Sequence, residues 1–194
     1  MSIKVSCTPK FKEVEVYGTT FQCCPDGNVY RLLKRSGKFK LCSNNKPNGE
    51  GYIQVTIRTA NGDKKVLLHR IHYLAFHPEF DIYDESIEID HRNVNNADNS
   101  IGNLRMATHG ENGRNRPKYS NNTSGYKNIN AEYHKKSDTW YWLVDIRHDS
   151  SRHRKSFRAG DGEKPSPLPP VPQHVIEYRD EMLRKLHGEF ANLG

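Results

Sequence analysis

Apolar and polar residues alternate in several short segments of the N-terminal third of the chain. In residues 51–58 the alternation puts Ile53, Val55 and Ile57 on one face, and a turn at residues 61–63 leads into a second apolar run. Shorter runs at residues 14–17 and 29–32 flank a turn at residues 25–28 and are also typical of strands. These patterns predict a small β-rich module over residues 1–66.

The middle of the chain changes from strand-like to helical periodicity. Residues 69–77 (HRIHYLAFH) predict a short helix that buries Ile71, Leu74 and Ala75 and ends before Pro78. We interpret its His69 and His72 as ordinary helix histidines, although a metal site is the alternative.

Residues 87–116 predict the order strand, loop, strand, helix. Residues 87–90 alternate as a strand, residues 93–102 are a loop rich in Asn and Asp, and residues 104–107 are a second strand. Thr108 and Glu111 have the spacing of a capping box, and the helix that they open must end near Arg116 because Pro117 follows. We predict that residues 67–117 form one module.

A polar linker at residues 118–123 separates this module from a C-terminal module at residues 124–194. Strands are predicted at residues 126–133, 140–147 and 152–158. After a Pro-rich stretch, a helix over residues 173–187 carries apolar residues at helical spacing, which we expect to cover the sheet: Val175, Tyr178, Met182 and Leu186. The predicted fold class is α+β, built from an N-terminal β-sheet module, a ββα centre and a three-stranded sheet with one helix.

Composition favours several small modules over one large core. Only 34% of the 194 residues are hydrophobic, and the net charge is +7. The excess of Lys and Arg lies in residues 1–60 and 119–160, whereas residues 61–118 are nearly neutral. Basic flanks around a neutral centre favour binding to a polyanion, with ordinary solubilising charge as the alternative.

The four cysteines do not form the spacing of a zinc ribbon. Cys7, Cys23, Cys24 and Cys42 contain no CxxC pair, so we expect reduced thiols in a cytoplasmic protein, and a four-thiolate zinc site is the alternative. No leader-like or membrane-spanning segment is expected, because no apolar stretch is long enough.

The residues with the clearest chemistry lie in the central module. Asp90 is a hard oxygen ligand, Asn112 offers a neutral oxygen from the following helix, and His91 is a base with a pKa near neutrality. One or two protein oxygens suit Mg²⁺, or Mn²⁺, because such an ion keeps several waters and leans on a substrate phosphate. These parts match the needs of phosphodiester hydrolysis.

At these positions the chain resembles the HNH (His-Me finger) endonucleases, and among them the phage-type homing endonucleases. The resemblance rests on Asp90-His91, Asn103-Leu104-Arg105 and Asn112 in HGENGRN. It implies that Asp90 and Asn112 bind one metal ion, that His91 is the general base and that Asn103 braces the hairpin. Arg105 is a candidate phosphate clamp, and His109 is a further candidate for the metal shell.

The C-terminal module resembles the AP2/ERF DNA-binding domain. The matching residues are Ser124-Gly125-Tyr126-Lys127, residues 140–147 and the final LRKLHGEFANLG. This resemblance implies a sheet that lies in the major groove and a helix that packs behind it. It makes four residues candidates for DNA contact: Lys127, Arg147, Arg154 and Arg158. In the plant regulators of this family the first strand carries basic residues, whereas this chain has Asn130 and Glu132 there. This difference puts recognition of DNA bases by that strand in doubt.

In the N-terminal module, which has the layout of the modules that precede HNH units in homing endonucleases, basic side chains on the strands are also candidates for DNA contact: Arg31, Lys34 and Arg35.

The sequence therefore predicts a metal-dependent endonuclease that cleaves double-stranded DNA, a site-specific homing-type enzyme that acts as a monomer and nicks its target. The resemblance implies a phage or mobile element as the source. The alternative from another class is a sequence-specific DNA-binding regulator with an inactive HNH centre. An RNA-binding sheet is less consistent, because the chain has no aromatic run of the RNP type. The DNA sequence of the target is not readable from this chain.

Overall fold

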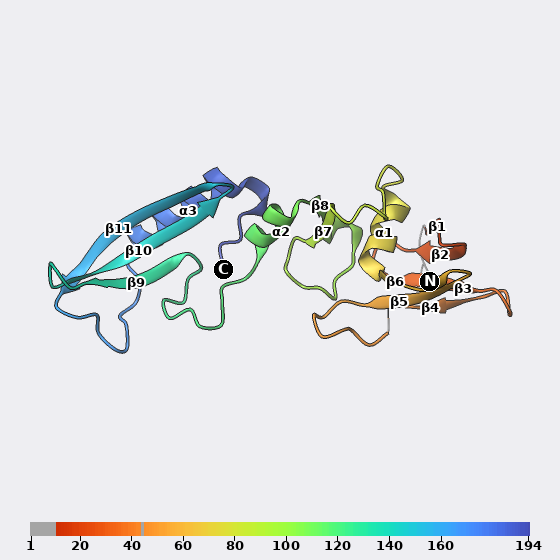
Figure 1. Cartoon of the computed structure of the whole chain (residues 1–194), viewed down its shortest axis with the longest axis horizontal. Coiled ribbons are helices and arrows are strands. Elements are labelled where there is room, and N and C mark those ends of the chain that lie inside the picture. Colours follow the sequence, from red (N-terminus) through yellow and green to blue (C-terminus); the bar gives the residue numbers. More distant parts are fainter. Residues whose placement is uncertain (1–10, 44) are drawn as a thin grey trace, which may run out of the picture. The chain divides into compact units, whose positions relative to one another are not determined.

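The structure is a computed structural model that describes residues 11–43 and 45–194. The chain divides into two compact units between His109 and Gly110. Each unit combines small antiparallel sheets with short helices (Figure 1), which confirms the predicted α+β class. The division falls inside the helix that follows Thr108, whereas the sequence predicts a linker at residues 118–123. The predicted module boundaries stay predictions.

The first unit begins with a four-stranded antiparallel sheet in the order β1-β2-β3-β4, formed by Lys12–Val16, Thr19–Cys23, Val29–Leu33 and Lys38–Leu41. The sequence predicted β1 and β3. It missed β2, in which Thr19 is buried beside Phe21, and β4 (KFKL), which has only four residues, none of them fully buried. Residues on the inner side, including Val16 and Val29, are fully buried.

A hairpin and a helix complete the core of this unit. Strands β5 (Gln54–Thr59) and β6 (Gly62–Leu67) pair around the predicted turn, and α1 (Leu68–Phe76) follows directly. Val55 and Ile57 are buried together with Ile71, so the predicted inward face of the strand does enter the core. The same cluster reaches Ile89 and Leu104, and thereby holds the following hairpin to α1.

This following hairpin consists of β7 (Glu88–His91) and β8 (Leu104–Ala107), with a short 3-10 turn at Ile101–Asn103 between them. Helix α2 (His109–Asn115) comes next, as predicted. The approach to β7 is fixed by Arg70 of α1. Its guanidinium donates to the carbonyl oxygens of Ile82, Asp84 and Ile87 at 2.6–2.9 Å.

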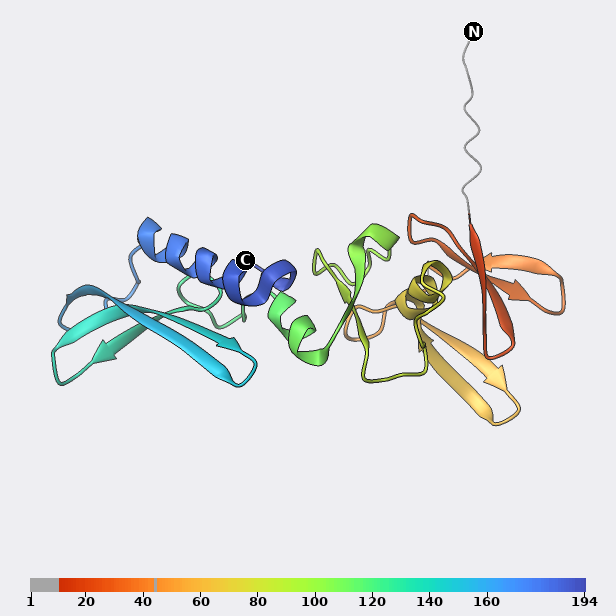
Figure 2. The ribbon, with the colours of Figure 1, turned by 90° about the horizontal axis from the view of Figure 1, so that it is seen from above.

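The second unit is a three-stranded antiparallel sheet with one helix along one face (Figures 1 and 2). Its strands are β9 (Ile129–His134), β10 (Thr139–His148) and β11 (Ser151–Asp161), with β10 in the centre. Trp142, Val144 and Ile146 of β10 are buried under α3 (Gln173–His187), whose bounds match the prediction. Alternation along β10 puts Tyr141, Asp145 and Arg147 on the other face of the sheet, together with the apolar Leu143.

The buried side of α3 contains two polar residues that the periodicity did not predict. Val175 and Leu183 are buried as apolar anchors, but Arg179 and His187 on the same stripe are buried too. Arg179 donates to the carbonyl of Leu193 at 2.5 Å and lies over the ring of Tyr126. Arg179 therefore fastens the C-terminal tail.

None of the helices in the described part of the chain is both long and apolar enough to cross a bilayer.

Candidate active site

The β7–β8 hairpin places the two central candidate residues in the interior of the first unit. Asp90 pairs with Arg105 across the two strands, and His91 pairs with Leu104. The strand forms here because Ile89, directly before these two residues, anchors it in the core. Asp90 and His91 are 4% and 3% exposed, so both are held by protein contacts rather than by solvent.

Asp90 forms a buried ion pair with Arg105. The Nε and Nη2 atoms of Arg105 lie 2.8 and 2.7 Å from Oδ2 of Asp90, and both side chains are almost inaccessible. Charge-assisted bonds from two nitrogens fix the plane of the carboxylate. The sequence assigned Arg105 to a DNA phosphate. In the structure its guanidinium holds a carboxylate inside the protein, because the cross-strand register brings Arg105 and Asp90 together. The phosphate contact stays a prediction.

His91 is held by Asn99, a residue that the sequence analysis did not select. The two side chains meet at 2.9 Å between Nε2 of His91 and Oδ1 of Asn99. An amide oxygen accepts, so Nε2 carries the proton and Nδ1 carries the lone pair. Burial lowers the pKa of His91, against the opposing effects of Asn99 and Asp90. The imidazole is therefore neutral near pH 7, as a general base must be.

Two aromatic rings surround the imidazole of His91. The ring of His69 lies edge-on to it with centroids 5.1 Å apart, and Tyr52 lies 5.9 Å from it and 5.2 Å from His69. Burial lowers the pKa of His69 to about 3, so this ring stays neutral and adds no charge beside His91. His69 therefore packs against His91, and among the described residues no three His, Cys, Asp or Glu side chains gather as metal ligands around it.

Asn103 holds the loop between the strands. Its Oδ1 accepts from the backbone N–H of Asn93 at 3.0 Å, and its Nδ2 donates to the carbonyl of Asp98 at 2.7 Å. These bonds close the loop that carries Asn99. The geometry is that of a brace, the role that the sequence analysis expected for Asn103, and its effect on catalysis stays a prediction.

The loop is also supported by a turn of the N-terminal sheet. Gly27 has a φ of +93°, and a Cβ atom there would lie 2.8 Å from the backbone carbon of Asn99. The backbone N–H of Ile101 donates to the carbonyl of Pro25 at 3.0 Å. The close approach requires glycine, because any side chain would push Asn99 away from the turn.

Asn112 lies on α2, beyond the point where the two compact units divide, so each of the predicted metal ligands belongs to its own unit. His109, the further candidate, is in the first unit. Its Nδ1 lies 2.7 Å from Oε1 of Glu88, which precedes Asp90 by two residues on β7. The side chain of His109 is otherwise exposed.

Within residues 11–43 and 45–194, no three His, Cys, Asp or Glu side chains cluster as metal ligands do. Cys23, Cys24 and Cys42 are buried free thiols, and burial raises the pKa of Cys23 to about 12. Cys7, the fourth member of the alternative zinc site, lies outside the described residues. The three described thiols pack as apolar side chains in the first core.

The N-terminal DNA candidates line one cavity of about 650 Å³. Arg31, Lys34 and Arg35 surround it together with Arg58. Arg31 also donates to the carbonyl of Thr56 at 2.8 Å, which joins β3 to β5. Four cations around one opening are consistent with phosphate contact, which stays a prediction for these residues.

The C-terminal candidates differ in how they are engaged. The Nζ atom of Lys127 donates to the carbonyls of Arg114 and Arg116 at 2.6 and 2.5 Å, and burial lowers the pKa of Lys127 to about 8. Arg147 is exposed on β10. Arg154 and Arg158 each have an acidic neighbour on the sheet.

Arg147 and Lys127 also line a cavity of about 630 Å³ in the second unit. Further cations that the sequence analysis did not select surround the same cavity: Arg114, Arg116, Lys118 and Arg152. Three of them, Arg114, Arg116 and Lys118, lie at the end of α2 and just after it, and could have been found from the basic residues at 114–118.

Comparison with known proteins locates the family signal in the central segment. A comparison with curated proteins gave no match. One solved structure, titled for DNA binding and cleavage by the HNH homing endonuclease I-HmuI, is similar with 25% identity and a TM-score of 0.42. The match covers 55% of this chain and 56% of that chain, so this chain spans little more than half of the length of that relative.

The comparisons do not support the AP2/ERF resemblance of residues 124–194, which stays a prediction. The family model described as HNH endonuclease matches residues 66–114. This range includes α1, the β7–β8 hairpin and Asn112. The resemblance to HNH endonucleases that the sequence analysis based on Asp90, His91, Asn103 and Asn112 is thereby supported for residues 66–114, which are similar to the HNH endonuclease family. The roles of the four residues stay predictions.

Proposed function

We propose that the protein is a divalent-metal-dependent endonuclease that hydrolyses phosphodiester bonds in double-stranded DNA. The observation that carries the proposal is the pair of fixed side chains on one hairpin: Asp90 locked by Arg105 and His91 locked by Asn99. Both pairs lie inside the segment that matches the HNH endonuclease model.

In this proposal His91 accepts a proton from the attacking water at its Nδ1 atom. The bond to Asn99 supports this role because it keeps the proton on Nε2 and fixes the ring. Burial supports it as well, because it keeps the imidazole neutral. Asn103 acts on His91 indirectly, because it holds the loop that carries Asn99.

The donor set fits a hard divalent cation such as Mg²⁺ or Mn²⁺. Asp90 and Asn112 would hold it through oxygen atoms, and few protein oxygens suit an ion that keeps waters and binds substrate phosphate. When bound, such a cation stabilises the negative charge that develops on the phosphate and on the leaving oxygen. Arg105 orients the carboxylate of Asp90 and also offsets part of its charge.

DNA contact outside the active site is assigned to the basic surfaces of both units. We infer that the cavity lined by Arg31, Lys34 and Arg35 and the sheet that carries Arg147 bind backbone phosphates. The sheet-and-helix architecture of residues 124–194 supports an AP2-like role for the second unit. Homing-type specificity, nicking by one catalytic site per monomer, and a phage or mobile-element source belong to the same proposal.

The alternative is a DNA-binding regulator whose HNH centre does not cut. One observation favours it: Arg105 shares Oδ2 of Asp90, which weakens the attraction of that carboxylate for a cation. Against it, the alternative gives no reason for the Asn99 bond that sets the tautomer of His91.

Incubation of supercoiled plasmid with the purified protein separates the two functions. The endonuclease is expected to convert the plasmid to the nicked circle with Mg²⁺ or Mn²⁺ and not with EDTA. His91→Ala should reduce the rate by about 10²–10⁴-fold while DNA binding persists, because a general base contributes to rate and little to affinity. If the protein shifts DNA in a gel but does not cleave it with either Mg²⁺ or Mn²⁺, the function is that of the regulator.

A further inference from the structure

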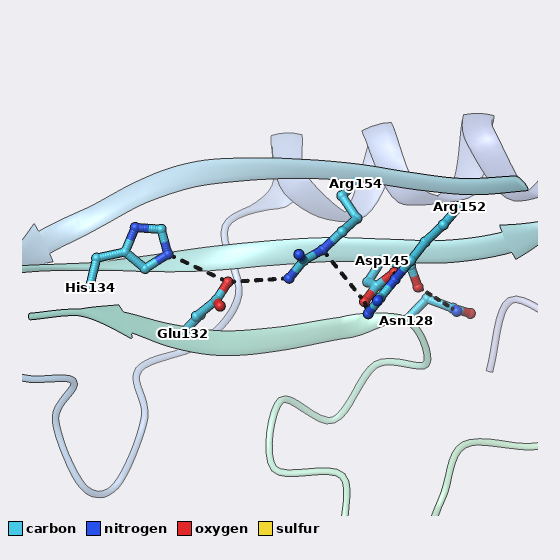
Figure 3. Close-up of polar contacts among 6 residues, drawn as sticks. All are labelled: Asn128, Glu132, His134, Asp145, Arg152 and Arg154. Carbon is cyan, nitrogen blue, oxygen red and sulfur yellow. Dashed lines mark hydrogen bonds and ion pairs between the residues drawn. The ribbon is translucent and has the colours of Figure 1, made fainter.

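A chain of ion pairs crosses the open face of the C-terminal sheet, opposite α3. Figure 3 shows it running from His134 and Glu132 on β9 through Arg154 to Asp145 on β10 and Arg152. The register explains the grouping, because Asp145 pairs with Arg154 across β10 and β11 and the next open-face pair is Arg147 with Arg152. Acidic and basic groups therefore interleave on the surface proposed to meet DNA.

Asp145 is the best-held member of this chain. Arg152 grips both of its carboxylate oxygens, with Nε 2.8 Å from Oδ1 and Nη2 on Oδ2. Nε of Arg154 lies 3.7 Å from the same Oδ2 atom. The hydrogen bond from Arg152 lowers the pKa of Asp145, so the carboxylate stays charged.

The backbone of Asp145 is fixed as firmly as its side chain. Its N–H donates to the carbonyl of Asn128 at 2.9 Å, and the side-chain amide of Asn128 donates back to its carbonyl at 2.9 Å. Asn128 takes a left-handed conformation with a φ of +64°, which allows this exchange just before β9 begins. The carboxylate is thus a rigid point of the face.

Glu132 is held less closely. Its Oε2 atom lies 3.6 Å from Arg154 and 3.5 Å from His134, and its side chain is more exposed than that of Asp145. Arg147 is the contrast. Its side chain is exposed, and within the described residues no ion pair joins it to an acidic group, although its charge helps to lower the pKa of Asp145. In the described part of the chain, this face therefore presents Arg147 beside arginines that are held by carboxylates.

These pairs contribute little to folding. Arg152 and Arg154 are about half exposed, and ion pairs between exposed groups stabilise a fold only weakly. The sheet is held by the apolar cluster on its other face, which includes Trp142, Val144 and Leu183. Carboxylates on this face also repel phosphate, so they lower its affinity for DNA of any sequence.

We propose that Asp145 is a specificity-determining residue for DNA. Its carboxylate holds the guanidinium groups of Arg152 and Arg154, and it allows a base edge to bind in the groove only where a base amino group faces it. Cytosine and adenine present such a donor in the major groove, and a carboxylate accepts from it. The carboxylate of Asp145 repels a phosphate or a base carbonyl group at the same place. This inference rests on the proposed DNA-binding role of the second unit and adds how that role becomes selective.

The test compares Asp145→Asn with Asp161→Asn in the full-length protein. Asp161 pairs with Arg158 at the far end of β11 and is highly exposed. Both substitutions remove one negative charge, but Asp161→Asn releases one arginine whereas Asp145→Asn releases two. Each protein is bound, with EDTA present, to duplexes carrying a randomised core, and the selected sequences are read. Binding of selected and unselected duplexes is then measured against salt.

Both variants should bind unselected duplexes more tightly, because each gains one net positive charge. Only Asp145→Asn is expected to lose selectivity, by about tenfold in the ratio of selected to unselected affinity, with loss of the amino-bearing base at one position of the consensus. Asp145→Glu, which keeps the charge, should retain that position. Equal ratios and equal consensus sequences for the two Asn variants would overturn the inference.

Arg147→Ala separates this outcome from failure of the proposed function. A shallower salt dependence in Arg147→Ala, by about 0.9 in the logarithmic slope, shows that the sheet meets DNA whatever Asp145 does. An unchanged slope removes the sheet from the DNA interface and overturns both. Tryptophan fluorescence of Trp140 and Trp142, which lie under this sheet, verifies that each variant is folded.

Discussion

Arg105 and Asp90 face each other across β7 and β8, and the carboxylate predicted to bind metal is already bound by a guanidinium at 2.7–2.8 Å. Both side chains are buried, so neither charge is compensated by water. Arg105 is thus the residue that sets the position of Asp90, and the pair links the stability of the hairpin to the chemistry of the site.

Arg105→Met should destabilise the first unit strongly. Removal of one partner of a buried ion pair leaves the other charge uncompensated and costs about 3–5 kcal/mol. The exposed Lys64→Met is the control, with an expected effect within about 0.5 kcal/mol. Urea unfolding can be followed by labelling of Cys23, Cys24 and Cys42, which are buried in the native unit. Equal midpoints for the two variants would show that the ion pair is not a structural element.

Asn99→Ala is expected to lower the cleavage rate with little change in DNA affinity. The ring of His91 would lose the acceptor that keeps its proton on Nε2, and we expect a loss of about 10–100-fold, the scale reported for partners that orient a histidine in metal sites. Asn99→Asp retains an acceptor and should recover part of the rate. Single-turnover cleavage at saturating protein measures both, and a wild-type rate in Asn99→Ala would remove Asn99 from the site.

Gly27→Ala should impair cleavage although the residue is distant in sequence from the HNH segment. Its Cβ would collide with the backbone of Asn99. Gly18→Ala is a matched control, because Gly18 also has a positive φ but its Cβ would meet no atom within 4 Å. Backbone strain is common to both variants. An additional loss of stability in Gly27→Ala, about 1–3 kcal/mol for overpacking, therefore reports the contact with Asn99. An additional loss of cleavage rate reports the same contact. Matching losses in the two variants would count against it.

The sequence predicted elements well where periodicity and punctuation agreed. Strand β8 and helix α3 were placed at their observed bounds, because Thr108 and Pro172 flank regular apolar patterns. Strand β4 was missed although its lysines and apolar residues alternate, because it has only four residues and three of them are exposed.

The partners of the site residues could not be predicted in the same way. Asn99 and Gly27 are unremarkable in a loop and a turn, and their roles arise only when the N-terminal sheet packs against residues 98–101. Arg105 was assigned to DNA because an arginine pattern carries no information on burial. Cross-strand register, which depends on the loop length, decides that it meets Asp90 instead.

Acid should destabilise the first unit partly through His72. This residue is fully buried, its Nε2 lies 2.7 Å from the carbonyl of Cys24 and its Nδ1 has no partner. Burial lowers the pKa of His72 below 6.5, so the unfolded chain binds a proton that the folded unit does not. Stability contributed by the neutral form is therefore present above pH 6.5 and falls as the pH drops, by up to about 1.4 kcal/mol per pH unit.

His72→Gln retains a donor for the Cys24 carbonyl and removes the titration. Its free energy of unfolding, followed by cysteine labelling, should depend less on pH below 6.5 than that of the wild type. His77→Gln, at a partly exposed position of the same helix region, serves as the comparison and should keep the wild-type slope. A wild-type slope in His72→Gln would mean that His72 is charged or exposed in the folded unit.

Lys127→Met distinguishes a capping role from the DNA contact that the sequence predicted for Lys127. The ammonium holds the carbonyls of Arg114 and Arg116 at the end of α2, the helix that carries Asn112. Loss of these charge-assisted bonds should destabilise the second unit by about 1.5–3 kcal/mol, seen as a lower urea midpoint of tryptophan fluorescence. Cleavage should weaken too, because Asn112 depends on an ordered α2. The salt dependence of DNA binding should stay at the wild-type slope, since the ammonium faces protein oxygens. A slope shallower by about 0.9 with an unchanged midpoint would instead place Lys127 on a phosphate.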